Sequence, residues 1–146
     1  MTEHDLLEVV EIEEASGLSI WGWDAYHSEL MQGGYTLMFV ARNLNGGSPQ
    51  RRIAGFIASR LVGDELHVNN VAVRKEFRRV GIGRALLETV IEKGASRSAR
   101  HAFLEVRASN RAAQALYKRC GFSITGLRKN YYSDPREDAL VMSREL

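Results

Sequence analysis

A basic turn that carries two glycines is the first stretch of this sequence that could do chemistry. We expect a strand ending at Val73 to lead through this turn into Gly81-Ile82-Gly83, where a helix begins. Glycine lets the backbone approach a ligand closely, and the first amides of a helix are unpaired at the positive end of its dipole. The same turn carries the cations Arg78, Arg79 and Arg84. The pattern suits a pyrophosphate, although a tight turn before an amphipathic helix would explain the glycines equally well.

Two well-known phosphate-binding loops do not match this turn. A Rossmann fingerprint requires a third glycine, and that position is Leu86. A Walker A loop requires Gly-Lys-Ser/Thr, which does not follow the glycines here. The turn therefore indicates an anion site of a different kind.

Two further residues could move protons. Glu105 lies between Leu104 and Val106 in an expected strand, so its side chain points opposite to theirs and could take a proton from an amine. The polar face of an edge strand would also explain this glutamate. Tyr117 follows Asn110 by seven residues, or two helical turns, so the two side chains face the same way. A tyrosine at this spacing is also typical of core packing.

The histidines and the cysteine indicate no metal site. His4, His27 and His101 show no ligand spacing, and Cys120 is expected to pack at the end of a helix. His67 lies in an expected strand, where it could either assist proton transfer or serve a structural role.

The composition is typical of an ordinary globular domain. The 146 residues are 45% apolar and 26% charged, with 13 Gly, 2 Pro and 1 Cys, which excludes collagen-like, disulfide-rich and disordered classes. We expect one domain over residues 1–146 in the cytoplasm, because no apolar run approaches the roughly 20 residues of a membrane span and the N-terminus resembles no signal peptide. The net charge is only +2, yet the cations are 16 Arg and 4 Lys, and arginine suits phosphate or carboxylate partners.

The apolar periodicity predicts hairpin strands followed by alternating helices and strands. Helices are predicted over Leu6–Ser16 (capped by Asp5), Asp24–Met31, Gly83–Gly94 and Asn110–Cys120, and strands over Thr36–Arg42, Ile53–Leu61, Leu66–Val73, Ala102–Arg107, Ile124–Lys129 and Asp138–Arg144. Asn43–Pro49 is predicted to be a hairpin loop, and Gly94 and Gly121 to end helices. This order predicts the α/β class, or α+β by a stricter definition, with helices packed on a mixed sheet.

Motifs in the expected order make the sequence resemble a known family. Asn70-Val71-Ala72-Val73 followed by Arg78-x-x-Gly81-x-Gly83 resembles motif A of the GCN5-related N-acetyltransferases (GNAT). Leu104–Asn110 and Ala115-Leu116-Tyr117-x-x-x-Gly121-Phe122 resemble motif B. The stretches Arg128–Tyr132 and Arg136–Met142 resemble the C-terminus of the ribosomal-protein-alanine N-acetyltransferases (RimI type). The resemblance covers nearly the whole chain, although the strand that usually precedes the first helix is short or missing.

The resemblance implies a GNAT fold, with a mixed, mostly antiparallel sheet and helices on both faces. It implies acetyl-coenzyme A as co-substrate without a metal, Glu105 as the base, and Tyr117 as the donor of a proton to the coenzyme A sulfur. The acetyl-coenzyme A site would comprise Val71, Val73, Arg78, Arg79, Val80, Gly81, Ile82, Gly83, Arg84 and Asn110, and the substrate wall would comprise Trp21, Tyr131 and Tyr132. Successive strand residues point to opposite faces, so only one of the two tyrosines need touch a peptide. Arg136, Glu137 and Asp138 are expected in a solvated turn.

The ionisation of amines favours one acceptor class. An α-amino group with pKa near 7.8 is about 30% neutral at pH 7.4, whereas lysine near 10.4 is about 0.1% neutral, a gap of roughly 3.5 kcal/mol. We therefore expect a protein N-terminal acetyltransferase whose amine attacks directly in a ternary complex. By resemblance, its client is the N-terminal alanine of small-subunit ribosomal protein eighteen.

Other functions remain open at this stage. The alternative within enzymes is an N-acetyltransferase for lysine or a small amine. A non-catalytic acetyl-coenzyme A-binding module and an RNA-binding domain that uses Arg51, Arg52, Arg78 and Arg79 belong to other classes. The low net charge and the lack of interleaved aromatic residues argue against nucleic acid as a partner, and we expect no membrane partner.

Overall fold

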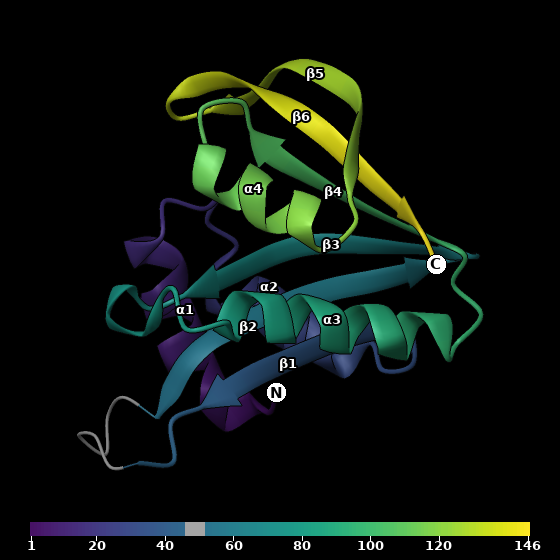
Figure 1. The fold of residues 1–146 in the computed structure, drawn as a ribbon. Helices are drawn as coiled ribbons and strands as arrows, with labels where there is room; N and C mark the ends of the chain where they lie inside the picture. The colour runs from purple at the N-terminus through teal and green to yellow at the C-terminus, as the bar shows by residue number, and fades with distance from the viewer. Residues whose placement is uncertain (46–51) are drawn as a thin grey trace.

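Six strands and four α-helices form the described part of the computed structural model, residues 1–45 and 52–146 (Figure 1). The strands are β1 (Thr36–Arg42), β2 (Ile53–Val62), β3 (Glu65–Val73), β4 (His101–Arg107), β5 (Ser123–Ser133) and β6 (Arg136–Glu145). The helices are α1 (Leu6–Ala15), α2 (Gly22–Met31), α3 (Ile82–Ala95) and α4 (Arg111–Arg119), with 3-10 turns at Glu3–Asp5 and Lys75–Phe77. Every predicted element is present, β1 with the predicted ends and the others with shifted ends, while the loop predicted over Asn43–Pro49 lies partly outside the described residues.

The strands form one sheet in the order β1-β2-β3-β4-β6-β5. Only the pairing of β3 with β4 is parallel among the strand pairs of the described residues, and the other neighbours run antiparallel. A parallel pair needs a crossover connection, and α3 supplies it between β3 and β4. These observations confirm the predicted α/β class and the mixed, mostly antiparallel sheet.

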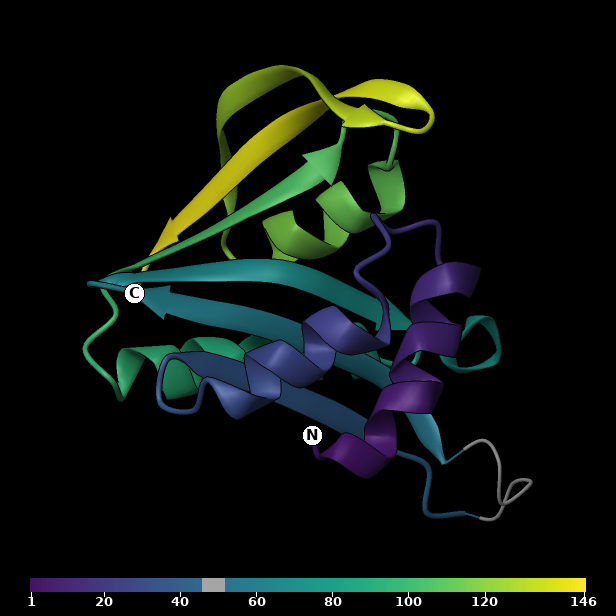
Figure 2. The same ribbon diagram turned by 180° about the vertical axis from the view of Figure 1, so that it is seen from behind.

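Helices cover both faces of the sheet, as predicted. Figure 1 shows α3 and α4 in front of the sheet, and Figure 2 shows α1 and α2 on the opposite face. The core beneath α3 includes the fully buried Leu66, Leu87 and Val90, whereas the core beneath α1 and α2 includes Tyr26 and Phe56. None of the helices in the described ranges has the length and apolar character needed to cross a membrane.

A bulge in β3 divides this strand between the two cores. Ala58 of β2 is opposite Asn70, but Ser59 is opposite Val68, so Asn69 is an extra residue in the ladder. The extra residue reverses the alternation of side chains. Before it, Val68 belongs to the α3 core, and after it, Ala72 belongs to the α1–α2 core.

The bulge coincides with the point at which β3 and β4 separate. Their parallel pairing covers Glu65 to Val68 on β3 and His101 to Leu104 on β4. Beyond these pairs the strands diverge toward the α1–α2 connection, as both views show (Figures 1 and 2). The sheet therefore opens into a wedge between the second half of β3 and the end of β4.

The first turn of the chain confirms one expectation and corrects another. Glu3–Asp5 form a 3-10 turn, in keeping with a short or missing strand before α1. Asp5 stands at the N-cap position of α1, but its carboxylate caps no helix amide. It accepts hydrogen bonds from Thr2 N (2.8 Å) and Arg42 Nη2 (3.0 Å), because its helical backbone directs the side chain away from the helix amides.

Gly94 does not end α3, which continues to Ala95. A Cβ at Gly94 would lie 3.0 Å from Leu66 Cδ2, so this glycine allows close contact between helix and sheet. Gly121 does follow the end of α4, with a φ of +84° that favours glycine, as predicted.

We predict that Ile57→Ala lowers the free energy of unfolding by about 2–5 kcal/mol, because Ile57 is fully buried beneath α3 and its loss leaves a cavity. Urea denaturation followed by circular dichroism measures the change. The control is Val62→Ala on the same strand, where the side chain is 54% exposed and a change within about 0.5 kcal/mol is expected. Equal losses in the two variants would contradict the proposed packing.

Candidate active site

The wedge between β3 and β4 holds a pocket of about 150 Å³. Its walls come from the α1–α2 connection, the bulged half of β3, the end of β4, α4 and β5. The pocket brings together the predicted site residues Trp21, Val71, Glu105, Asn110, Tyr117, Tyr131 and Tyr132. These residues are far apart in the sequence and come together because the sheet opens at this point.

Glu105 supplies the carboxylate of the pocket. Its neighbours Leu104 and Val106 are buried, whereas the Glu105 side chain is 26% exposed, so the alternation predicted for this strand is present. Arg128 Nε lies 3.5 Å from Glu105 Oε1, close enough for an ion pair. The carboxylate therefore faces both the pocket and solvent, where it can accept a proton and release it.

Tyr117 supplies a protonated hydroxyl. The residue is only 7% exposed, and burial raises the pKa of its hydroxyl above the ordinary value of about 10. Asn110 begins the same helix, and its Oδ1 accepts a hydrogen bond from Ala113 N at 3.1 Å. Both residues line the pocket, as their seven-residue spacing predicted, and Tyr117 remains a proton donor well above neutral pH.

Both tyrosines of β5 line the pocket, although the alternation of a regular strand would require only one of them to do so. The β5–β6 register shifts between Arg128 and Tyr132, and Asn130 has a φ of +51°. This irregularity breaks the alternation of a regular strand. The rings of Tyr131 and Tyr132 meet edge to face with centroids 5.1 Å apart, and both line the pocket. Burial is the main cause that raises the pKa of Tyr132 to about 12.

Arg107 is a pocket residue that the sequence analysis missed. Its guanidinium donates hydrogen bonds to the carbonyls of Asp134 and Pro135, each at 3.0 Å, and its Cζ lies 4.1 Å from the Tyr132 ring centroid. Arg107 therefore ties the β5–β6 turn to β4. Arg107 lies two residues after Glu105, on the same face of the strand. This spacing could have predicted from the sequence that Arg107 also faces the pocket.

Glu137 adds a second link between the end of β4 and the start of β6, instead of lying in a solvated turn. Residues 136–138 begin β6, and Glu137 Oε2 accepts a 2.6 Å hydrogen bond from Ser109 N. Its other oxygen lies 3.5 Å from Arg107 Nη1. Hydrogen bonding by Ser109, together with Arg107, holds the pKa of Glu137 below its ordinary value. The expectation of a solvated turn is wrong because the turn is tighter and ends at Arg136.

The glycine turn before α3 has the geometry of an anion site. Gly81 adopts a φ of +90° and caps α3, and the first helical hydrogen bond runs from Ala85 N to Gly81 O at 2.9 Å. The amides of Ile82, Gly83 and Arg84 therefore precede the helix hydrogen bonds and lie at its positive end. A Cβ at Gly83 would lie 3.3 Å from Leu116 Cδ2, so the start of α3 closely approaches α4.

The side chains of this turn are mainly exposed. Arg78 Nε donates to Val73 O at 2.8 Å, which folds the turn back on the end of β3. Arg84 pairs with Glu88 at 2.7 Å, and Val80 is 73% exposed. The structure places Val73, Arg78, Arg79, Val80, Gly81, Ile82, Gly83 and Arg84 in this turn or beside it, and none of them lines the pocket in the wedge.

His67 does not line the pocket. Its Nε2 lies 2.7 Å from Glu65 Oε2, and its ring stacks on Phe103 with centroids 5.6 Å apart. Cys120 is buried, and burial raises the pKa of its thiol. Across residues 1–45 and 52–146, no three His, Cys, Asp or Glu side chains are grouped to hold a metal ion.

Comparison with known proteins gives one consistent result. The model of the acetyltransferase (GNAT) family matches residues 6–122. A protein of Bacillus subtilis (strain 168), provisionally named ribosomal protein bS18-alanine N-acetyltransferase, is 36% identical over 142 residues, 97% of this chain and 90% of that protein. The Escherichia coli (strain K12) enzyme with this name is 45% identical over 94 residues, 63% of this chain and 64% of the enzyme.

The crystal structure of the ribosomal-protein-S18-alanine N-acetyltransferase from Escherichia coli superimposes with a TM-score of 0.84 at 35% identity. The match covers 99% of this chain and 90% of that one. This similarity extends over both the sheet wedge and the turn before α3, which the family model also includes. The chain belongs to the acetyltransferase (GNAT) family.

Proposed function

We propose that this protein is an acetyl-coenzyme A-dependent N-terminal acetyltransferase, whose acceptor is the N-terminal alanine of a small-subunit ribosomal protein. The observation that carries the proposal is the joint placement of a solvent-facing carboxylate, Glu105, and a buried hydroxyl, Tyr117, on one pocket. The names of the Bacillus and Escherichia relatives describe the same acceptor. We further propose that residues 1–146 act as one domain in the cytoplasm.

Acetyl transfer to an amine needs a base and an acid, and the pocket offers both. Glu105 takes the proton from the ammonium group, and the neutral nitrogen then attacks the acetyl carbonyl carbon directly. As the carbon–sulfur bond breaks and the amide forms, the nitrogen releases its second proton to water, and the Tyr117 hydroxyl gives its proton to the departing sulfur. A proton from solvent then restores the Tyr117 hydroxyl. Val71 lines the same pocket, and we assign to its backbone the orientation of the acetyl group.

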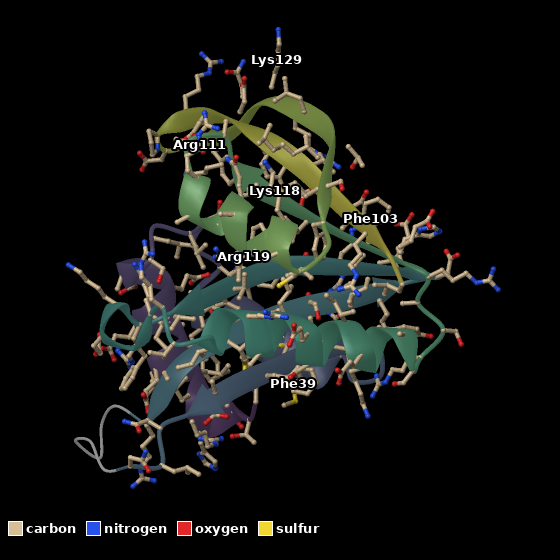
Figure 3. All side chains as sticks on the ribbon, in the orientation of Figure 1. Phe39, Phe103, Arg111, Lys118, Arg119 and Lys129 are labelled. Carbon is tan, nitrogen blue, oxygen red and sulfur yellow. The ribbon has the colours of Figure 1, made fainter. Side chains whose placement is uncertain are left out.

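The turn before α3 suits the phosphates of acetyl-coenzyme A. Its unpaired amides lie at the positive end of a helix, and Arg78, Arg79 and Arg84 add positive charge nearby. The adjacent α4 contributes the exposed cations Arg111, Lys118 and Arg119 (Figure 3). Val73 Cγ2 lies 3.7 Å from the Cβ position of Gly83 in this turn, and Asn110 lines the pocket, so we assign both residues to the site of the same co-substrate.

The acceptor side of the pocket suits a small first residue. Trp21 of the α1–α2 connection lines this side of the pocket, together with Tyr131 and Tyr132 of β5. Three aromatic side chains therefore surround the space where the end of the peptide would lie. Alanine presents a single methyl group to these rings, which agrees with the acceptor in the names of the Bacillus and Escherichia relatives.

The first test compares two acceptor peptides by mass spectrometry in the presence of acetyl-coenzyme A. We expect acetylation of the N-terminal peptide of the organism's own ribosomal protein bS18. We expect none on the same peptide when its α-amine is blocked and a free lysine is supplied. Modification of the lysine peptide alone would replace the proposal with lysine acetylation. If neither peptide is acetylated, the remaining alternatives are an enzyme that acetylates a different amine and a non-catalytic acetyl-coenzyme A-binding module.

We expect Glu105→Gln and Tyr117→Phe each to lower kcat by about 10²–10⁴-fold, because each removes one proton-transfer group and preserves side-chain size. The raised pKa of Tyr117 also predicts that tyrosine ionisation does not reduce kcat of the wild-type protein below about pH 10. Glu92→Gln and Tyr35→Phe are exposed controls that should retain wild-type turnover. A kcat close to wild type in either pocket variant would refute the assigned role.

Gly81→Ala tests the acetyl-coenzyme A site. A φ of +90° costs an L side chain roughly 1–2 kcal/mol, so the turn should distort and raise KM for acetyl-coenzyme A about tenfold. KM for the peptide should stay unchanged in steady-state assays. Gly63→Ala is the matched control, since Gly63 has a φ of +61°, also lies in open space, and belongs to the distant β2–β3 turn. An equal effect on KM in both variants would count against the assignment.

A further inference from the structure

A fully buried carboxylate lies outside the reaction described above. Glu13 of α1 is 0% exposed and lies beneath the helices that cover β2 and β3. Removal of a charge from water costs several kcal/mol unless hydrogen bonds compensate, and an apolar residue would fill such a position without this cost. The proposed chemistry makes no use of Glu13, so its presence calls for another role.

Neutral donors surround the Glu13 carboxylate. Oε1 accepts hydrogen bonds from Trp21 N at 2.9 Å and from the Tyr26 hydroxyl at 2.6 Å, and Oε2 accepts from Gly22 N at 3.0 Å. Asn70 Nδ2 donates to the Tyr26 oxygen at 2.8 Å and lies 3.4 Å from Glu13 Oε1. The carboxylate thus joins the start of α2, where the helix dipole favours negative charge, to the bulged part of β3.

These contacts hold one wall of the pocket. The segment from Ser16 to Trp21, which connects α1 with α2, contributes most of its residues to the lining. Asn70 belongs to the opposite wall, next to Val71. Glu13 therefore links the acceptor side of the pocket to the strand on which the acetyl group is expected to lie.

Leu18 and Trp21 of the segment also pack on the α1–α2 core, but apolar packing alone does not fix the direction of the segment's backbone. Gly17 and Gly22 have φ values of +65° and +75°, conformations that a chain adopts readily only at glycine. The Ser16 Oγ is buried without a hydrogen-bond partner among the described residues. The hydrogen bonds that the backbone amides of Trp21 and Gly22 donate to Glu13 therefore provide the main polar attachment of the segment at its α2 end.

We propose that Glu13 is a positioning residue that fixes the Ser16–Trp21 segment and so determines how well the acceptor peptide binds. This inference rests on the proposed function. The role requires a carboxylate, because two backbone amides and a hydroxyl all donate to its two oxygens. Glutamine has the same size, but its amide nitrogen would face one of these donors.

The test is Glu13→Gln, with Glu14→Gln as the matched control on the exposed neighbour. Loss of hydrogen bonds to a charged group predicts a rise of about tenfold or more in KM for the alanine peptide. KM for acetyl-coenzyme A and kcat should stay within about twofold of wild type. A loss confined to kcat would place Glu13 in the chemical step and overturn the positioning role, as would an unchanged KM for the peptide.

A second readout does not depend on activity. Trp21 packs against Tyr26 with ring centroids 5.4 Å apart, and Trp23 is the other tryptophan of the chain. In a Trp23→Phe background, Glu13→Gln should increase acrylamide quenching of the remaining Trp21 fluorescence, while Glu14→Gln should not. Equal quenching in the two variants would overturn the inference. If the wild-type protein acetylates no α-amine, the proposed function fails and the quenching still tests the hold of Glu13 on the segment.

Tyr26→Phe keeps the proposal testable if Glu13→Gln does not fold. It removes one hydroxyl from the fully buried network and preserves the aromatic packing on Phe56. We expect a smaller rise in KM for the peptide, of roughly three- to tenfold, together with increased quenching. Wild-type values of both quantities in Tyr26→Phe would overturn the proposal in that case.

Discussion

The early end of the β3–β4 pairing is the constraint on which the rest of the site depends. After Val68 and Leu104 the two strands share no ladder, so backbone groups of β3 that would pair with β4 face the wedge instead. On its other edge, β3 still pairs with β2 as far as Val73, which keeps the open edge rigid. A substrate that enters the wedge therefore meets a strand edge held in place from behind, and the extra residue Asn69 marks the point where this edge begins.

Two connections close the sides of the wedge, and one charged side chain holds each of them. On β4, Arg107 donates to the carbonyls of Asp134 and Pro135 in the β5–β6 turn. On α1, Glu13 accepts from two amides at the start of α2. Hydrogen bonds to charged groups are about twice as strong as those between neutral groups, which suits them to fixing loops that lack strand pairing. A cation thus binds loop carbonyls on one side, and an anion binds loop amides on the other.

Local patterns in the sequence were sufficient to predict the helices, the strands and the turn before α3. Apolar periodicity located the helices and strands, and the glycines marked the start of α3, because both signals arise within a few neighbouring residues. The errors arose where pairing between distant segments decides the geometry. The irregularity at Asn130 brings both Tyr131 and Tyr132 to the pocket, and contact with Leu66 explains Gly94. The period of two after Glu105 could place Arg107 on the pocket face of β4 but could not reveal what it binds, and nothing local marked Glu13, because both side chains bind backbone atoms of segments that only the tertiary fold brings near.

In the proposed reaction, the unequal exposure of Glu105 and Tyr117 would separate the base from the acid. Glu105 is 26% exposed, so a proton that it takes in the proposed reaction would be able to pass to water. Tyr117 is 7% exposed and its pKa is raised by burial, so it keeps its proton until a strong base, such as a departing thiolate, forms beside it. Such a difference in environment allows one group of a pocket to act as the base and another to act as the acid. An α-amine places a modest demand on Glu105, because a substantial fraction of it is already neutral near pH 7.4, whereas lysine would require the carboxylate to overcome roughly 3.5 kcal/mol more.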